Sequence, residues 1–412
     1  MSIEPYFKTQ LGRLYCGDSL EVLKQLPSGS VDVVVTSPPY WSKRDYGDAT
    51  CKVWGGDPNC EHEWEPYDGV VEYQIKNERR KVSSDFRSAF CKKCGAWYGQ
   101  LGLEPTPEMF VEHLIEIFRE VKRVLKDTGS LFVVIDDSYL GSMQGFGATK
   151  PSKTGFQWTG DGHYAASRGK PPTAGFTKLR KSMALVPELF AIKMVYEEGW
   201  ILREKIIWSK KVHFYKDKTT YGNAMPESVK DRFCHTWEYI YHFTKSQKYY
   251  FDLDALRVPY RDTTIKRFKY PVGKFGGNPS QPDARLGKGI SGGSDATYVE
   301  PHPLGANPGD VVCIPTRPFS GAHFAVFPPE IPEVCIKATC PPEGVVLDPF
   351  AGAGTTLVVA EKMGRRWIGI EINPEYCELI KRRFKKELGK QYSTRRLIRY
   401  FSRGGGAYGT VL

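Results

Sequence analysis

The sequence lacks the long apolar runs that place a chain in a membrane. No stretch approaches the roughly 20 apolar residues that a spanning helix needs. Residues 1–10 also lack the apolar segment of a secretory signal peptide. We therefore expect a cytoplasmic protein with no membrane partner.

Cysteine is also sparse, with ten residues in a chain of 412, and most of them are scattered. A disulfide framework needs a dense, even set of cysteines in a short chain, so this class of protein is excluded. Reduced thiols and one metal cluster explain the cysteines better.

Acidic residues are the minority charge: 47 Asp and Glu stand against 58 Lys and Arg, and the net charge is +11. Many soluble proteins are mildly basic, but an excess of this size favours a polyanionic partner and a nucleoid-associated location. With 41% hydrophobic residues, the chain can bury one large core and a smaller module.

Residues 31–40 are the first informative stretch. The valine-rich run from Val31 to Val35 is too short for a helix and predicts a parallel strand covered on both faces. Pro38 and Pro39 then remove two backbone donors and hold the loop extended. The Ser37 hydroxyl and nearby carbonyls therefore form an acceptor-rich pocket beside Tyr40, suited to an exocyclic amino group on a planar heterocycle.

Residues 344–356 form the second informative stretch, a buried strand that enters a glycine-rich turn and then a helix. Gly352 and Gly354 let the backbone approach a ligand closely, as nucleotide-type cofactor loops require. The next predicted strand, 366–371, ends in Glu371, about twenty residues after the glycines, the spacing at which a carboxylate meets ribose hydroxyls.

Together, Thr36-Ser37-Pro38-Pro39-Tyr40 and residues 348–356 (DPFAGAGTT) resemble the amino-group DNA methyltransferases, which make N4-methylcytosine or N6-methyladenine from S-adenosylmethionine. Because the catalytic loop precedes the cofactor loop, the chain resembles the circularly permuted β group of that family. The resemblance covers most of residues 11–388. It implies an α/β fold, a Rossmann-like class I sheet that is mostly parallel with helices on both faces, and double-stranded DNA as partner.

The resemblance also implies site residues. The catalytic loop comprises Ser37, Pro38, Pro39 and Tyr40. The cofactor residues are Asp18, Thr36, His323, Asp348, Pro349, Phe350, Ala351, Gly352, Gly354, Thr355, Thr356, Glu371 and Asn373. Asp18 is the acid expected near the cofactor adenine, with a plain helix cap as the alternative.

The methylated base stays open between two choices. Adenine enzymes of this family more commonly carry an acid in the first motif position, so Ser37 favours the N4 amine of cytosine over the N6 amine of adenine. Two further alternatives are methylation of an RNA base or a glutamine side chain, and a zinc-containing nucleic-acid-binding protein without activity. A cognate restriction endonuclease, the recognition sequence and the oligomeric state are left open.

Residues 51–98 hold a candidate metal site. Cys91-Lys92-Lys93-Cys94-Gly95 is a CxxC knuckle, and Cys60-Glu61-His62 supplies a second pair, which together predict a closed structural zinc site. Cys51 is the rival fourth ligand. A redox CxxC would need a strand-to-helix context that is missing here.

Other stretches predict core elements and DNA contacts. We expect a helix that begins at Thr106-Pro107 and ends at Gly129, a strand at 131–135, a helix at 186–196, a strand at 200–208, and a hairpin of 237–243 with 248–253. Asp136, Asp137 and Ser138 could either position substrate or cap a loop.

Residues 201–275 carry sixteen Lys or Arg against eight Asp or Glu, interleaved with aromatics, and favour a DNA-facing surface. The expected DNA contacts are Lys43, Arg44, Lys210, Lys211 and Arg232, although Lys43 and Arg44 could also lie in a solvated loop.

We expect six segments: the catalytic-loop half at 1–50, a zinc-knuckle insertion at 51–100, a continuation of the methyltransferase domain at 101–140, a loop-rich target-recognition region at 141–310 with embedded core elements at about 183–255, the cofactor-binding half at 311–390, and a basic tail at 391–412.

Overall fold

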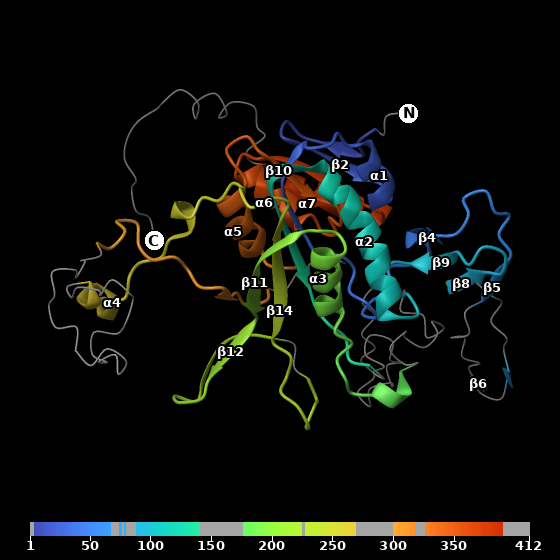
Figure 1. Cartoon of the computed structure of the whole chain (residues 1–412), viewed down its shortest axis with the longest axis horizontal. Coiled ribbons are helices and arrows are strands. Elements are labelled where there is room, and N and C mark those ends of the chain that lie inside the picture. Colours follow the sequence, from blue (N-terminus) through green and yellow to red (C-terminus); the bar gives the residue numbers. More distant parts are fainter. Residues whose placement is uncertain are drawn as a thin grey trace, which may run out of the picture. The chain divides into compact units, whose positions relative to one another are not determined.

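The valine run of residues 31–36 lies at the centre of a large mixed sheet. In this computed structural model, the strand β3 (Val31–Thr36) is buried along its whole length, as predicted. Within the described residues the sheet has nine strands in the order β1-β2-β17-β16-β3-β10-β14-β11-β15 (Figure 1). Their bounds are β1 (Phe7–Lys8), β2 (Gly12–Cys16), β10 (Leu125–Ile135), β11 (Ile201–Ser209), β14 (Trp237–Thr244), β15 (Val311–Cys313), β16 (Val345–Asp348) and β17 (Arg366–Glu371).

The structure describes residues 4–66, 74–75, 78–79, 88–140, 176–224, 227–268, 300–317 and 326–389. The chain divides into two units, one of Met1–Tyr250 with Val311–Leu412, and one of Phe251–Asp310. The second unit contains η4 (Asp254–Leu256) and α4 (Asp262–Arg267), and a bridge joins Val258 to Ala306. Residues 141–175 and 269–299 of the predicted target-recognition region lie outside the described residues, as does the predicted basic tail.

The middle of the sheet is parallel. Strands β2, β17, β16, β3 and β10 run in one direction, whereas β14 is antiparallel to both of its neighbours, β10 and β11. At the edges, β15 is parallel to β11 and β1 is antiparallel to β2. The carboxyl ends of β3 and β16 therefore meet at the same edge of the sheet, where open α/β sheets hold their ligands.

Helices cover both faces of the sheet, as the family resemblance implied (Figure 1). One face packs against α1 (Ser19–Gln25), α2 (Pro107–Val124) and α3 (Val186–Tyr196), and the other against α5 (Glu330–Thr339), α6 (Thr355–Lys362) and α7 (Pro374–Leu388). Successive residues of β10 alternate between the two cores: Leu131, Val133 and Ile135 join the first, while Phe132 and Val134 join the second. None of the helices among the described residues is long and apolar enough to cross a membrane.

Helix α2 begins as predicted but ends earlier. The Thr106 hydroxyl accepts a hydrogen bond from the Met109 N–H at 3.2 Å, and Pro107 occupies the first turn. The helix ends at Val124 rather than at Gly129, which lies inside β10. A Cβ at Gly129 would come within 2.8 Å of the Asp32 carbonyl oxygen, so this glycine serves close strand packing and not a helix cap.

The predicted hairpin of 237–243 with 248–253 is wrong. Residues 237–244 form β14, which pairs with β10 and β11, and residues 248–253 form no strand. The chain instead makes a hairpin from β12 (Lys211–Phe214) and β13 (Thr219–Gly222), which projects beyond the ends of β11 and β14 (Figure 1). Two further small sheets contain β4 (Cys51–Trp54), β9 (Trp97–Gln100), β8 (Ser88–Cys91) and β5 (Trp64–Pro66), and β6 (Gln74–Ile75) with β7 (Glu78–Arg79).

Candidate active site

One cavity lies where the loops after four parallel strands meet. It is lined by Asp18 after β2, residues 37–40 after β3, residues 349–353 after β16, and Glu371 and Ile372 at the end of β17. The two stretches that the sequence singled out, more than 300 residues apart, thus face one space. Val326 and Phe327 also line it, whereas His323 lies outside the described residues.

The glycine loop is held by a buried carboxylate on each side. Asp348 accepts hydrogen bonds from the Thr36 hydroxyl at 2.6 Å and from the Phe350 N–H at 3.1 Å. Glu371 accepts from the N–H groups of Gly352, at 2.7 Å, and Asn373, at 2.9 Å. Burial raises the pKa of Asp348 to about 6 and that of Glu371 to about 7.

Gly352 and Gly354 both adopt the left-handed backbone conformation, with φ of 54° and 75°. A Cβ at Gly354 would also come within 2.9 Å of the Ile380 side chain, so glycine is required by conformation and by space. Gly352, Ala353 and Thr355 line the cavity.

Five predicted cofactor residues lie behind the cavity lining rather than on it: Thr36, Asp348, Gly354, Thr356 and Asn373. The Thr356 hydroxyl donates to the Val35 carbonyl at 3.2 Å, and the Asn373 side chain caps α7 by accepting from the Glu375 N–H at 2.8 Å. These residues join neighbouring strands and shape the loop.

Asp18 combines the two roles that the sequence left open. Its carboxylate accepts from the Glu21 N–H at 3.2 Å, which caps α1, and it also faces the cavity. The Lys52 ammonium contacts it at 2.9 Å and lies 3.8 Å from the centre of the Trp54 ring. Lys52 and Trp54 line the cavity too and were missed from sequence, because the pattern around them indicates a metal site and not this cavity.

The Ser37-Pro38-Pro39-Tyr40 loop is tied to a strand far away in the sequence. The Ser37 hydroxyl donates to the Tyr40 hydroxyl oxygen at 3.3 Å, and Tyr40 donates to Glu238 Oε2 at 2.6 Å. Burial and the nearby Glu238 carboxylate raise the pKa of Tyr40 well above its ordinary value. Sequence reasoning missed Glu238, which lies 198 positions from Tyr40.

The acids after β10 separate into two roles. Asp137 accepts from the N–H groups of Leu185 and Val186 at 2.8 and 3.2 Å, and so caps α3. Asp136 instead contacts His235 Nε2 at 2.8 Å and the Lys43 ammonium at 3.7 Å. Its pKa is lowered, because the His235 contact and Lys43 outweigh the opposing effect of burial.

Comparison with known proteins agrees with this arrangement. The sequence profile of the N6/N4 methyltransferases, described as DNA methylase, matches residues 31–382. The chain belongs to this DNA methylase family. It is an S-adenosylmethionine-dependent amino-methyltransferase of DNA.

The matches to similar proteins cover nearly the whole length of the methylase. Type II methyltransferase M.XycI of Xanthomonas campestris pv. cyanopsidis is 33% identical over 89% of this chain and 85% of its own length. Type II methyltransferase M.Cfr9I of Citrobacter freundii is also 33% identical, over 91% and 88%. The solved structure of PvuII DNA methyltransferase, described as cytosine-N4-specific, covers 92% of this chain and 89% of its own with a TM-score of 0.51. At 18% identity, it shows a shared fold.

The basic residues expected on DNA have different surroundings in the methylase. Lys43 and Arg44 line the cavity. Lys210 is paired with Glu238, and Arg232 with Glu227 at 2.8 Å, with its guanidinium 3.9 Å from the centre of the Tyr139 ring. Lys211 is exposed on β12.

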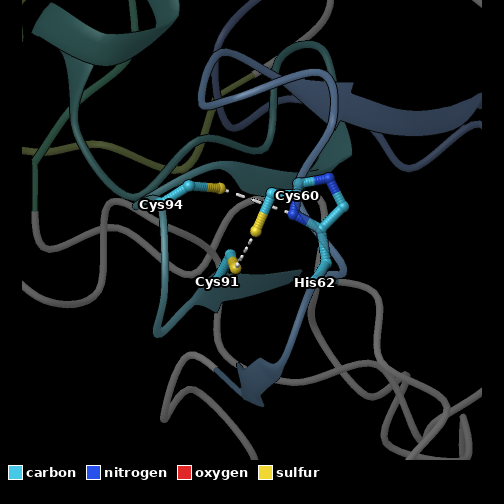
Figure 2. A group of neighbouring side chains, drawn as sticks. All are labelled: Cys60, His62, Cys91 and Cys94. Carbon is cyan, nitrogen blue, oxygen red and sulfur yellow. Dashed lines mark hydrogen bonds between the residues drawn. The ribbon is translucent and has the colours of Figure 1, made fainter.

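The four predicted metal ligands of the methylase lie together (Figure 2). The donor atoms of Cys60, His62, Cys91 and Cys94 are all within 4.8 Å of one another. Cys60 Sγ is 3.9 Å from Cys91 Sγ, and Cys94 Sγ is 3.4 Å from His62 Nδ1. Cys51 is not part of this group of donor atoms.

The segment that carries these four residues, the Cys/His module of residues 51–66 and 88–100, also forms part of the cavity wall. Trp54 and Gln100, on β4 and β9, line the cavity. Trp54 and Trp97 stack on the His113 ring of α2 with centroid distances of 4.3 and 5.4 Å. His113 Nδ1 contacts the buried carboxylate of Glu104 at 2.9 Å, which packs the module against the main core.

Proposed function

We propose that this chain is a site-specific DNA methyltransferase that transfers the methyl group of S-adenosylmethionine to the N4 amine of cytosine in duplex DNA. The observation that carries the proposal is the single cavity between Ser37–Tyr40 and the Gly352 loop. The choice of cytosine rests on Ser37 in the first motif position, where adenine enzymes of the family more commonly carry an acid.

In this proposal the target base leaves the duplex, at a cost of a few kcal/mol, and enters the cavity beside Tyr40. The Ser37 hydroxyl oxygen and the Pro38 carbonyl accept the amine hydrogens. These hydrogen bonds draw the nitrogen toward a tetrahedral geometry, so that its lone pair is no longer conjugated with the ring and is free to attack the methyl group. Pro39 keeps the loop extended so that both acceptors point one way. Positioning and electrostatics then account for the rate, without a covalent enzyme intermediate.

We assign the cofactor to the other side of the cavity. S-adenosylmethionine supplies the methyl group there when it is bound. Asp18 would face the adenine and Glu371 the ribose hydroxyls, while Pro349, Phe350, Ala351, Gly352 and Thr355 form the loop beneath them. His323 keeps its predicted role at this site as part of the proposal.

We also propose that the chain has the circularly permuted order of the β group. The catalytic strand β3 precedes the cofactor strands β16 and β17 in the sequence, yet β3 and β16 are neighbours in the sheet. The predicted segments, including a target-recognition region within 141–310, belong to the same proposal. Because the relatives are named type II methyltransferases, we extend it to a cognate restriction endonuclease.

The Cys/His module would hold one structural zinc ion. A tetrahedral ion with Zn–S bonds of about 2.3 Å places two sulfurs about 3.8 Å apart, close to the 3.9 Å between Cys60 and Cys91. Four protein donors leave no open coordination position, which favours a structural over a catalytic metal.

The experiment is to incubate the protein with S-adenosylmethionine and unmethylated, sequence-diverse duplex DNA, digest to nucleosides and identify products by mass spectrometry. We expect N4-methylcytosine, and we expect Ser37→Ala to lower turnover roughly 100-fold with unchanged cofactor affinity. N6-methyladenine would overturn the choice of base. No modified nucleoside, with the cofactor bound, would overturn the proposal.

A further inference from the structure

Methylation of an amine leaves a proton to be removed. When the amine nitrogen forms its bond to the methyl carbon, the carbon–sulfur bond breaks and its electron pair stays on sulfur. The nitrogen then carries two hydrogens, the methyl group and a positive charge, and must release one proton to become the neutral product. The Ser37 hydroxyl can accept this proton only if it passes its own proton on.

The hydrogen bonds of the catalytic loop lead away from the cavity in one direction. Ser37 donates to Tyr40 at 3.3 Å, and Tyr40 donates to Glu238 at 2.6 Å. The oxygen of each hydroxyl can therefore still accept a proton from the preceding group in this series of hydrogen bonds. The direction of donation is the one that a proton needs in order to move from the base to the carboxylate.

Glu238 is placed as an acceptor rather than as a surface charge. It lies on β14 and is only 6% exposed. The Lys210 ammonium pairs with Oε1, which leaves Oε2 for Tyr40. The other charged group acting on Tyr40 is Asp136, which is itself paired with His235 and Lys43.

We propose that Glu238 is the terminal proton acceptor of the methyl transfer, through Tyr40 and Ser37; this rests on the proposed function. The amine proton moves to Ser37 Oγ, the Ser37 proton to the Tyr40 oxygen, and the Tyr40 proton to Glu238 Oε2. Both hydroxyls end with the one hydrogen they began with. Glu238 ends neutral and releases its proton to solvent before the next turnover.

A purely structural role for Glu238, in which it only holds the Tyr40 ring in place, predicts different behaviour. Tyr40→Phe keeps the ring and removes the relay, and Glu238→Gln keeps a hydrogen-bonding side chain of similar size that cannot take up a proton. If the contact is only structural, both variants retain the pH dependence of the wild-type rate. If protons pass along it, both lose that dependence.

The test is the single-turnover methylation rate with prebound DNA and cofactor, measured across a pH series. We expect each variant to lose about 100-fold in rate, with unchanged cofactor and DNA affinity. Each variant should also lose the acid limb of the wild-type profile, which is the decrease in rate as the pH falls. The double variant should lose no more than the worse single variant. Glu204→Gln, at an exposed position of β11, should leave rate and profile unchanged.

Wild-type rates in Glu238→Gln, a retained acid limb, or multiplicative losses in the double variant would each overturn the relay. If Glu238→Gln fails to bind cofactor, Tyr40→Phe carries the test alone. Absence of any methylated nucleoside from the wild-type protein would instead count against the proposed function, so the two failures are distinguishable.

Discussion

At the residue scale, the buried carboxylates around the glycine loop determine how the cofactor cavity responds to pH. Glu371 faces the cavity, and burial raises its pKa from 4.5 to about 7. A carboxyl whose pKa is raised on folding contributes stability that is fully present below about pH 4.5 and is lost as the pH rises through about 7. Burial in the free protein therefore favours the protonated form, so that about half of the Glu371 side chains are protonated near pH 7.

In the proposed site, cofactor binding has the opposite preference, because the ionised Glu371 would accept two ribose hydroxyls. We predict that S-adenosylmethionine affinity weakens as the pH falls through about 7, by up to about tenfold per pH unit. Calorimetric titrations between about pH 8 and 6 measure this. Glu371→Gln should flatten the dependence, whereas Glu375→Gln, exposed in the first turn of α7, should keep it. A wild-type affinity that does not change with pH would refute the assignment of Glu371.

Residues of this kind differ in how readily a sequence reveals them. Ser37, Gly352 and Glu371 could be predicted because local chemistry marks them: a proline turn, a glycine turn and an acid at the end of a strand. Glu238 could not, because its proposed role depends on a contact with Tyr40 198 positions away. Asp137 could not be resolved from Asp136 either, since only the position of α3 shows which acid caps it.

At the element scale, the same distinction holds. The strands predicted at 31–35 and 200–208 and the helix predicted at 186–196 follow from local apolar patterns, and the structure confirms them as β3, β11 and α3, with strand bounds that differ by one residue. The partners of a strand are not encoded locally. Residues 237–244 pair with β10 and β11, on both sides of the strand, rather than with the next segment of the chain.

We propose that the β12–β13 hairpin contacts DNA phosphates. Lys211, Lys216 and Lys218 are exposed on it or its turn, beside Phe214 and Tyr215, which are 50% and 74% exposed. A two-stranded ribbon of this kind fits a DNA groove.

Replacing the three hairpin lysines with alanine should weaken duplex binding similarly for all sequences. We predict that the slope of log K against log salt falls in magnitude by about 1 per lysine, because fewer counterions are released. Fluorescence anisotropy at several salt concentrations measures the slope. A control with alanine at the exposed Lys24, Lys337 and Lys381, each paired with an acid on its own helix, should keep it. An unchanged slope in the hairpin variant would exclude the hairpin from the DNA interface.

At the scale of the whole molecule, contacts link the Cys/His module to both loops of the cavity. Trp97 follows the Cys91–Cys94 knuckle and stacks on His113. His113 contacts Glu104, which accepts from the Gly102 N–H at 2.7 Å. Gly102 in turn accepts from Ser42, just after the catalytic loop, at 2.7 Å. On the cofactor side, the module supplies Lys52 to Asp18.

Loss of the metal should therefore weaken cofactor binding as well as folding. We predict one zinc ion per chain by elemental mass spectrometry. Cys91→Ser, or chelation of the wild-type protein, should remove the zinc, lower the Tm and weaken S-adenosylmethionine binding roughly tenfold, because metal binding by the thiolates is coupled to folding. Cys51→Ser, in the same module but outside the cluster, should retain zinc and affinity. If Cys51→Ser loses the metal, the ligand set is wrong. If the zinc-free protein binds the cofactor normally, the module is an independent fold and not a wall of the cavity.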